Sequence, residues 1–446
     1  MLIDLLPYLA LGITAGTVAG FIPGVGVFVT LTLFYSFLLG LSPYEILAFY
    51  LGVASTTQYI GSITATVFSV PGETSSLPAV HEGHAMFLQG KGAYAISGAA
   101  IGSFLGSLIV LSLTAIVLPY IDNVLYLFTT NVQFLLIVAV LVLICFSSSK
   151  IYLSFFLAGV GYVLGMVGCR HVDTYCFATF DDPQLMAGLP MLPVICAVYI
   201  VPKLLTETES YDASLLKKGS VQTENFLQHI LYFARHWSSS VRGTVIGFFA
   251  GFTPGMSTTV SANLSYSAEK YVQKKSGNYK QGNYQSLVAA ETANNAGMFA
   301  SILPLILFGV PIVPSEALLY DLAASKGFIF GRNFDFDFFV ILAYLLVIAN
   351  CVALLIAWPF AKYVCLLHKI PPKIFNSLII ILLMYILYSS GQVMFMGQFY
   401  LLVFFILLPL GWAFRHYNTL PLIFTFVIQS RLESVLIRLF DLYVFS

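Results

Sequence analysis

The stretch GTVIGFFAGFTPGMS, residues 243–257, decides how this chain is organised. It starts as an apolar helix with a glycine at every fourth position, and Pro254-Gly255 stops that helix after about ten residues. At about 1.5 Å per residue, such a helix crosses only about half of a ~30 Å hydrocarbon core. A very similar stretch, GITAGTVAGFIPGVG, occupies residues 12–26. Two interrupted hydrophobic segments at matching places in two halves indicate the binding site of a transporter.

The composition places the chain in a lipid bilayer. Hydrophobic residues make up 59% of the 446 residues, charged residues only 9%, and the mean hydropathy is +0.90. Soluble globular proteins carry about 25% charged residues. The formal net charge is zero and no basic run alternates with aromatic residues, which argues against a nucleic-acid partner. We therefore expect an all-α polytopic membrane protein with roughly 10–12 membrane segments, because backbone groups in lipid must be satisfied within helices.

The two similar stretches divide the chain into two membrane repeats. We expect the first repeat at residues 1–205, a cytoplasmic linker with an interfacial helix at 206–240, and the second repeat at 241–446. Each repeat begins with broken helices that form a re-entrant hairpin with a Pro-Gly tip, at about residues 8–40 and 243–268.

The placement of lysine and arginine indicates that the repeats have inverted topology. None occurs in residues 1–90, whereas Lys217, Lys218, Arg235 and Arg242 precede the second Pro-Gly stretch and Lys270, Lys274, Lys275 and Lys280 follow it. Because cytoplasmic loops collect such residues, the second hairpin enters and leaves the membrane on the cytoplasmic side. The first hairpin then enters from the opposite side. We expect a multi-pass protein of the cell (inner) membrane.

Polar side chains follow each hairpin at corresponding positions. They are Ser55, Thr56, Thr57, Ser62 and Thr64 in the first half and Glu291, Thr292, Asn294 and Asn295 in the second. Aligning residues 68–71 with residues 308–311 places Ser55 opposite Asn295. Irregular backbone at membrane depth persists only where it is buried in protein or lines a wet cavity, and helix N-termini attract anions. The alternative role of these polar residues is to hold helices together.

We expect the hairpin tips and these polar residues to bind the substrate. The candidates are Pro23, Gly24, Gly26, Ser55, Thr56, Ser62, Pro254, Gly255, Ser257, Thr258, Asn294 and Asn295. Candidates for the coupling ion are Glu291, Asn295 and Thr57. Glu291 lies about ten residues past the basic loop, on the order of 15 Å into the bilayer, where an ionisable residue indicates function. The alternative is that Glu291 caps a helix that starts late.

Other chemically active residues have simpler explanations. His81 and His84 are three positions apart in a Gly-containing loop, whereas zinc on a helix requires a spacing of four and a third ligand, so we expect no metal or cofactor site. Asp181-Asp182 is expected to be solvated surface. Cys169 and Cys176 share one polar loop and form a disulfide only if that loop faces an oxidising compartment.

These residues resemble the large membrane subunit of the tripartite tricarboxylate transporters. The resemblance covers most of residues 8–330 and rests on the two Pro-Gly stretches and on residues 61–65 (GSITA), 70–72 (VPG), 180–193 (FDDPQLMAGLPMLP) and 290–296 (AETANNA). The chain departs from the family pattern at Ala290, where the family has proline, and at Ser257, where it has glycine. The resemblance implies that the chain receives a small carboxylate from a periplasmic or extracellular binding protein and works with a small membrane subunit.

Residues and resemblance together predict the permease subunit of a cation-coupled secondary transporter for small organic carboxylates, such as di- or tricarboxylates. Alternating access between the inverted repeats is expected, with Na⁺ or H⁺ as the coupling ion, and a homodimer is left open. Two other classes are a membrane-embedded enzyme that uses Glu291 or the His81/His84 loop, and a non-transporting membrane scaffold.

Overall fold

The computed structural model describes residues 2–22, 25–68, 74–118, 130–146, 150–169, 176–209, 226–331, 336–358, 372–393, 397–417 and 419–444. The first half contains α1 (Leu2–Gly20), α2 (Val27–Leu33), α3 (Tyr35–Leu38), α4 (Pro43–Phe68), the 3-10 turn η1 (Thr74–Ser76), the π-helical turn η2 (Ala79–Gly83), α5 (His84–Leu88), α6 (Gly92–Val117), α8 (Thr130–Phe146), α9 (Ile151–Met166), β1 (Gly168–Cys169), β2 (Cys176–Phe177), α10 (Pro183–Met186), α11 (Met191–Ile195), the π-helical turn η4 (Cys196–Ile200) and α12 (Val201–Glu209). The second half contains α13 (Phe226–Arg235), α14 (Trp237–Gly251), α15 (Ser257–Lys275), α16 (Tyr284–Phe308), α17 (Pro314–Ala324), α18 (Phe336–Ala357), α20 (Pro372–Val393), α21 (Gly397–Ala413) and α22 (Leu420–Val444).

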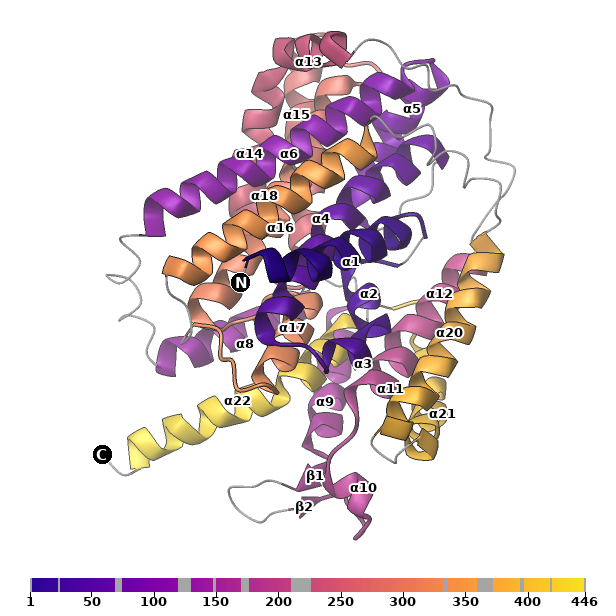
Figure 1. Cartoon of the computed structure of the whole chain (residues 1–446), viewed down its shortest axis with the longest axis vertical. Helices are drawn as coiled ribbons and strands as arrows, with labels where there is room; N and C mark the ends of the chain where they lie inside the picture. Colours follow the sequence, from indigo (N-terminus) through magenta and orange to yellow (C-terminus); the bar gives the residue numbers. More distant parts are fainter. Residues whose placement is uncertain are drawn as a thin grey trace.

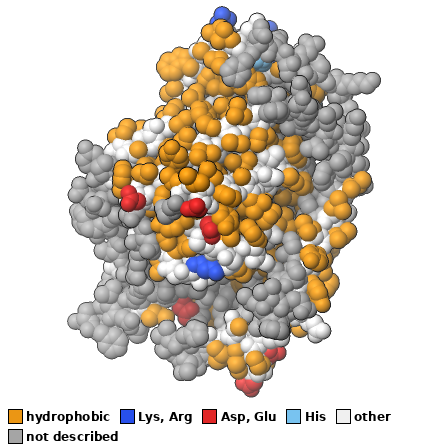
Figure 2. Space-filling view, viewed as in Figure 1, with side chains coloured by type: hydrophobic (Ala, Val, Ile, Leu, Met, Phe, Trp, Pro, Cys, Tyr) orange, Lys and Arg blue, Asp and Glu red, His pale blue; other side chains and the backbone are white. Residues whose placement is uncertain are grey.

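The described helices have the length and surface of a membrane protein. Four stretches are long and apolar enough to cross a bilayer: Leu2–Gly20, Pro43–Val67, Gly92–Ile116 and Phe336–Ala357. Hydrophobic side chains cover most of the described part of the face seen in Figure 2. The prediction of an all-α polytopic membrane protein is confirmed, and the total number of membrane segments stays a prediction.

Two helix pairs, α1 with α4 and α14 with α16, pack through glycines in the same way. Gly12, Gly16 and Gly20 lie against α4 at Phe49, Val53 and Thr57, and Gly243, Gly247 and Gly251 lie against α16 at Ala289, Ala293 and Gly297. A Cβ atom at Gly16 would come within 2.7 Å of the Val53 carbonyl oxygen. The close approach of the helices therefore requires glycine.

These contacts also relate the two halves in register. Gly12 of α1 corresponds to Gly243 of α14, and its contact Phe49 on α4 corresponds to Ala289 on α16. Phe49 and Ala289 differ in residue number by 240, and the sequence alignment places Ser55 opposite Asn295 with the same difference. The packing therefore supports that alignment. The opposite orientation of the two repeats in the membrane stays a prediction.

The two halves are interlocked. Helix α4 of the first half packs against α18 of the second, and α16 of the second half packs against α6 of the first. Farther from this centre, α9 packs against α22, and α21 packs against η4. Figure 1 shows α4, α6, α16 and α18 gathered in one body, with helices from both ends of the colour scale next to one another. Core helices of each half are therefore covered by helices of the other half.

The helices that lead to the Pro-Gly tips are longer than the sequence pattern predicted. Helix α14 begins at Trp237 and has 15 residues, and α1 has 19 residues. At about 1.5 Å per residue, α14 extends about 22 Å, roughly three quarters of the ~30 Å hydrocarbon core, and α1 extends about 28 Å, nearly all of it. Helix α14 continues back beyond Gly243 because Ser239 and Arg242 bind a carboxylate on α15. The re-entrant path of both hairpins stays a prediction.

The central linker ends in an amphipathic helix. Residues 210–225 lie outside the described part of the chain, and α13 follows them. Leu227, Ile230 and Leu231 on α13 are exposed, whereas His229 and Phe233 are buried. Exposed apolar side chains on one face of a helix suit the membrane interface, which supports the predicted interfacial helix. Its cytoplasmic location stays a prediction.

The polar loop after α9 folds into a disulfide-linked β-hairpin. Strands β1 and β2 pair antiparallel with Cys169 opposite Cys176, and the two sulfur atoms are bonded. Asp181 and Asp182 are exposed, as expected, and Asp182 caps α10 by accepting a hydrogen bond of 2.7 Å from the backbone N–H of Gln184. This loop lies at the opposite end of the long axis from α13 (Figure 1). Because disulfides persist in oxidising compartments, the loop is expected outside the cytoplasm.

Candidate functional site

The two core helices α4 and α16 are joined by a hydrogen bond between amide side chains. Nδ2 of Asn294 donates to Oε1 of Gln58 over 2.8 Å, and both residues are buried. The apolar window of α4 is fully buried, and α16 is buried over most of its length. Polar groups in this position have no access to water, so each one requires a partner within the protein or a ligand.

Two further contacts lie on either side of this bond. Asn295 donates to Ser103 of α6 over 2.7 Å, and Asn350 of α18 donates to Ser55 over 3.4 Å. The hydroxyl of Tyr59 donates to Oδ1 of Asn350 over 3.0 Å. Ser55 and Asn295 are the two positions that the repeat alignment places opposite each other. Each of them forms a serine–asparagine hydrogen bond with a helix of the opposite half: Ser55 with Asn350 on α18, and Asn295 with Ser103 on α6.

Oxygen atoms without a hydrogen-bond partner gather beside this crossing. Among the described residues, both carboxylate oxygens of Glu291 and the side-chain oxygens of Ser62, Asn294 and Asn295 are buried and accept no hydrogen bond. Ser62 and Asn294 lie next to the Glu291 carboxylate without reaching hydrogen-bond geometry. Nearly all buried polar atoms in proteins are paired, and an unpaired buried carboxylate is costly. These atoms therefore mark a place for a cation or a proton.

Glu291 belongs to the interior of its helix. Helix α16 begins at Tyr284, and its N-cap residue Asn283 accepts a hydrogen bond of 2.8 Å from the backbone N–H of Ser286. The cap is thus formed by Asn283, and Glu291 lies about two turns farther on. Glu291 is only 1% exposed. This geometry removes the alternative in which Glu291 is a helix cap near the cytosol.

The hydroxyl groups of Thr56 and Thr57 face the neighbouring helix α1. Thr56 lies 3.2 Å from the carbonyl oxygen of Ile13, and Thr57 lies 3.4 Å from that of Gly16. Both hydroxyls also donate to carbonyl oxygens of the preceding turn of α4. These contacts hold α4 against α1, so they favour the helix-packing role for both threonines.

The tip of the second hairpin is anchored to the loop that follows α16. The backbone N–H of Gly255 donates to the carbonyl oxygen of Ile312 over 2.7 Å, and Pro254 is buried. Glu316 holds the same loop, because its carboxylate accepts hydrogen bonds from the backbone N–H of Ile312 (3.0 Å) and from the Ser301 hydroxyl (2.6 Å). Gly255 has a φ of +77°, a conformation that favours glycine. The tip is therefore fixed by its backbone.

The helices that follow the two tips begin without a side-chain cap. Helix α2 follows Gly26 and helix α15 follows Met256, and neither N-cap side chain accepts a hydrogen bond. Ser257 is buried and Thr258 is half-buried in the first turn of α15. Backbone N–H groups at such helix starts are suited to an anion. Pro23 and Gly24, which form the first tip, lie outside the described residues.

The structure brings together only part of the predicted site. Ser55, Ser62, Glu291, Asn294 and Asn295 lie around the crossing of α4 and α16. The second tip lies farther along α16, because Gly251 packs against Gly297 and the tip follows Gly251. The predicted set therefore separates into a crossing cluster and a tip.

Sequence analysis missed the partners from α6 and α18 and the glutamate that anchors the tip. Asn350 is the only amide in the stretch 336–357, which is otherwise apolar beyond Asp337 in its first turn, and that contrast was a usable signal. Ser103 has no such signal, because it lies among other small residues of α6. Glu316 follows Pro314, a usual helix start, so its burial was not foreseeable from the sequence.

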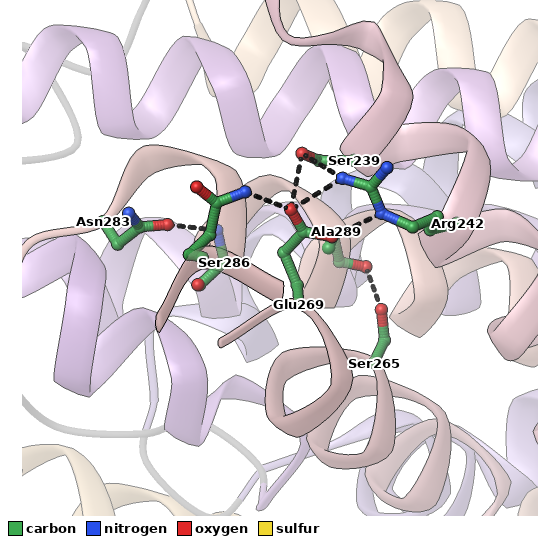
Figure 3. Close-up of polar contacts among 8 residues, drawn as sticks. Ser239, Arg242, Ser265, Glu269, Asn283, Ser286 and Ala289 are labelled. Atoms are coloured by element: carbon green, nitrogen blue, oxygen red, sulfur yellow. Dashed lines mark hydrogen bonds and ion pairs between the residues drawn. The ribbon is translucent and has the colours of Figure 1, made fainter. Parts of the chain in front are cut away.

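A charged cluster closes the base of the second hairpin, just outside residues 243–268 (Figure 3). Arg242 on α14 donates two hydrogen bonds, of 2.7 and 2.8 Å, to the carboxylate of Glu269 on α15. Ser239 and Gln273 also donate to this carboxylate, over 3.1 and 2.7 Å. Burial acts to raise the pKa of Glu269, but the hydrogen bonds from Arg242, Gln273 and Ser239 lower the pKa below its ordinary value.

The two histidines of the Gly-containing loop have separate contacts. Nδ1 of His84 lies 3.0 Å from the carbonyl oxygen of Thr66, and the ring of His81 stacks on the ring of Tyr266. Each histidine thus faces a different neighbour. Their contacts are those of packed side chains.

Unpaired polar atoms buried at the crossing of the core helices of a polytopic helical protein are typical of membrane transporters. The comparison with protein families gives the more specific result. A family model described as the Tripartite tricarboxylate transporter TctA family matches residues 6–424. The chain belongs to this family, which confirms the resemblance, and it is a family of transporters and not of enzymes.

Curated relatives of the chain are described as uncharacterized. The chain is 29% identical over 317 residues to an Agrobacterium vitis protein described as an uncharacterized 52.8 kDa protein in the TAR-I ttuC' 3' region, a match that covers 71% of this chain and 63% of the relative. It is 25% identical over 276 residues to an uncharacterized protein of Methanocaldococcus jannaschii, covering 60% and 62%. The chain thus spans less than two thirds of the length of these relatives. No solved structure matches.

Proposed function

We propose that this chain is the permease subunit of a cation-coupled secondary transporter for small organic carboxylates. The observation that carries the proposal is the group of unpaired, buried oxygen atoms of Glu291, Asn294, Asn295 and Ser62. It occurs in a chain whose family carries tricarboxylate transport in its description. The two repeats take opposite orientations in the membrane. Alternating access arises when they exchange conformations, because the site then opens to the other side of the membrane.

The coupling ion binds at Glu291. Its buried carboxylate has no hydrogen-bond partner among the described residues, and a bound Na⁺ or proton neutralises it. The side chains of Asn294 and Ser62 lie next to the carboxylate, and their unpaired oxygens complete a shell of oxygen atoms for a small, hard cation when the amide turns toward it. Asn295 adds an oxygen one helical turn beyond Glu291. Thr57 is the weakest of the predicted ligands, because its hydroxyl donates to backbone carbonyls.

The carboxylate substrate binds between the crossing cluster and the hairpin tips. Helix α15 presents the N–H groups of its uncapped first turn, at Ser257 and Thr258. The tip residues Pro254 and Gly255 are held in place by Ile312, so the anion site needs little reorganisation on binding. The first tip, with Gly26 at its end, makes the equivalent contribution from the other half. The cation at Glu291 offsets part of the substrate's negative charge.

The family description implies two partners for the permease. A soluble binding protein outside the cytoplasm delivers the carboxylate, and a small membrane subunit completes the complex. The disulfide-linked hairpin of Cys169 and Cys176 is exposed on the side where such a binding protein arrives.

Uptake into proteoliposomes tests the proposed function. The purified chain, with a candidate small membrane subunit and a candidate binding protein from the same organism, is reconstituted and given radiolabelled citrate or succinate with an inward Na⁺ gradient, a proton gradient or neither. We expect uptake only with one of the two gradients, at least roughly tenfold above protein-free vesicles. Uptake that ignores both gradients contradicts cation coupling, and no uptake of any carboxylate favours the scaffold alternative.

Two variants make the test specific for the site. Glu291→Gln keeps the size of the side chain but removes its charge, so we expect gradient-driven uptake to be lost while the amount of protein in the membrane is unchanged. Asp181→Asn is the matched control, because Asp181 is exposed and lies between β2 and α10, two elements that are far from α4 and α16 in Figure 1. Full gradient dependence in Glu291→Gln would remove Glu291 from the proposed ion site.

A further inference from the structure

The carboxylate of Glu82 is enclosed by donors from the other half of the chain. Glu82 lies in η2 of the first half and is buried. Its Oε1 atom accepts hydrogen bonds from the hydroxyls of Tyr266 (2.8 Å) and Tyr279 (2.7 Å). Its Oε2 atom accepts from the backbone N–H groups of Gly282 and Asn283, both over 2.8 Å. One side chain thus holds α15 and the loop between α15 and α16.

A lysine reinforces this contact. Nζ of Lys270 donates to the hydroxyl of Tyr266 over 2.9 Å and lies 4.9 and 5.0 Å from the ring centres of Tyr266 and Tyr279. A cation over an aromatic ring is attracted by the ring, and a hydroxyl that accepts from an ammonium group donates more strongly. The contact therefore combines residues of both halves into one charged network.

A second contact of the same kind lies elsewhere in the molecule. The hydroxyl of Tyr35 on α3 lies 3.5 Å from Oδ2 of Asp321 on α17. Tyr35 and Tyr266 are related by the same shift as Gly12 and Gly243, so they occupy equivalent positions in the two hairpins. In Figure 1, α3 and α17 are neighbours, away from the end of the molecule where α13 lies.

The carboxylates of the two contacts are also equivalent. The shift that relates Ser55 to Asn295 carries Glu82 to within one residue of Asp321. In both contacts, a tyrosine of one hairpin meets a carboxylate in the segment that follows the core helix of the other half. The Glu82 contact has four hydrogen bonds of 2.7 to 2.8 Å, whereas the Tyr35–Asp321 distance is at the outer limit for a hydrogen bond. Two equivalent contacts are thus in different states.

We propose that these contacts are the two gates of the transporter, which open in turn: the Glu82 gate (Glu82 with Tyr266, Tyr279, Gly282 and Asn283) and the Asp321 gate (Asp321 with Tyr35). The proposal rests on the proposed function. The described conformation has the Glu82 gate closed and the Asp321 gate loose. Because Lys270 and Lys274 lie beside the Glu82 gate, this gate faces the cytoplasm. When the halves exchange conformations, the Glu82 gate loosens and Tyr35 closes onto Asp321.

Thiol labelling in membrane vesicles tests the gates without requiring transport. The reporter is Ser265→Cys, in a chain whose Cys145, Cys196, Cys351 and Cys365 are replaced by alanine. Ser265 is fully buried against the carbonyl oxygen of Ala289, so a membrane-impermeant maleimide supplied on the cytoplasmic side reaches it only when that side opens. The readout is the labelling rate. A failure of carboxylate uptake therefore leaves this test unaffected.

Two variants loosen the Glu82 gate to different degrees. Glu82→Gln still accepts from tyrosine hydroxyls, but its NH₂ group cannot accept from Gly282 and Asn283, so we expect labelling at least roughly tenfold faster. Tyr279→Phe removes one donor and is expected to give a smaller increase, and it keeps the test decisive if Glu82→Gln does not accumulate. Asp321→Asn is expected not to accelerate labelling. The proposal would be overturned if Glu82→Gln and Tyr279→Phe were both labelled at the rate of the parent. It would also be overturned if Asp321→Asn accelerated labelling as much as Glu82→Gln does.

Discussion

Asn294 donates a hydrogen bond of 2.8 Å to Gln58, and this bond joins residues that are 236 positions apart in the chain. It is made between the two core helices, each of which belongs to a different half. Both residues are buried, so a change in the distance between α4 and α16 breaks the bond without water to replace it. The crossing therefore couples the position of one half to that of the other.

Removal of this bond is expected to stop transport. Asn294→Ala takes away the amide that binds Gln58 and that lies beside Glu291, and it leaves the Gln58 amide buried without its partner. We expect at least a tenfold loss of carboxylate uptake and a loss of about 1–3 kcal/mol of stability. Uptake in proteoliposomes and the melting temperature measure the two effects. Gln228→Ala, which removes an exposed amide on α13, is the control. Normal uptake in Asn294→Ala would assign Asn294 to helix packing alone.

Cation binding is expected to stabilise the protein through Glu291. A ligand present at about 100 times its dissociation constant adds about 2.7 kcal/mol to the free energy of unfolding. We therefore expect Na⁺ or a lower pH to raise the melting temperature of the parent in detergent, with choline as the inert cation. In Glu291→Gln the Na⁺ response should disappear. A response of equal size in both proteins would place the ion elsewhere.

The glycines between α14 and α16 are expected to be irreplaceable. A Cβ atom at Gly251 would lie 2.7 Å from the Gly297 carbonyl oxygen, so Gly251→Ala must push the helices apart. We expect a cost of about 1–3 kcal/mol, typical of overpacking. Gly159→Ala on α9 is the matched control, because a Cβ atom there meets nothing within 4 Å. We expect Gly159→Ala to be neutral or slightly stabilising. Equal melting temperatures for the two variants would contradict the close packing.

The base of the second hairpin is expected to lose its charge pair in acid. The pKa of Glu269 is lower in the folded state than in the unfolded state. The ion pair therefore stabilises the protein above the unfolded-state pKa, and this stabilisation is lost as the pH falls through the folded-state pKa. We expect Arg242→Leu to cost roughly 2 kcal/mol at neutral pH, between the values for exposed and buried pairs. The difference in melting temperature from the parent should shrink below about pH 4.5. A difference that is constant with pH would exclude the ion pair as its cause.

The Cys169–Cys176 pair provides a test of membrane orientation. In intact cells, a membrane-impermeant maleimide should leave the parent loop unlabelled, whereas Cys169→Ser frees Cys176, which is exposed and should react from outside. Cys196→Ser is the control, because Cys196 is buried. Reaction of Cys176 only after the cells are opened would place this loop in the cytoplasm and reverse the predicted topology.

The parts of the fold that were predictable are the ones repeated in the sequence itself. The alignment that places Ser55 opposite Asn295 required only that the two halves contain similar residues. The contacts of Gly12 and Gly243 follow the same register. The predicted ends of the membrane segments were only approximate. Helix α14 begins earlier than the apolar pattern because Arg242 is satisfied by Glu269 on a different helix, which a local pattern does not contain.

Tertiary partners account for most of what the sequence did not reveal. Ser103 and Asn350 reach the crossing because α6 and α18 pack on the core helix of the opposite half. Glu82 lies between two histidines whose spacing does not fit zinc, and sequence analysis assigned it no role, whereas in the structure its carboxylate accepts hydrogen bonds from the other half. Sequence spacing predicts which side chains share a helix face, but it does not predict which helix comes to cover that face.

The exchange of partners between the halves has a consequence for how the protein is made. Helix α6 leaves the ribosome long before α16, the helix that covers it. The Ser103 hydroxyl therefore lacks its hydrogen-bond donor until Asn295 has been synthesised. The first half must therefore wait in the bilayer with polar positions exposed to lipid. Insertion machinery that shields such intermediates becomes a requirement for assembly, and the two halves, produced as separate polypeptides, should be degraded alone and rescued by co-expression.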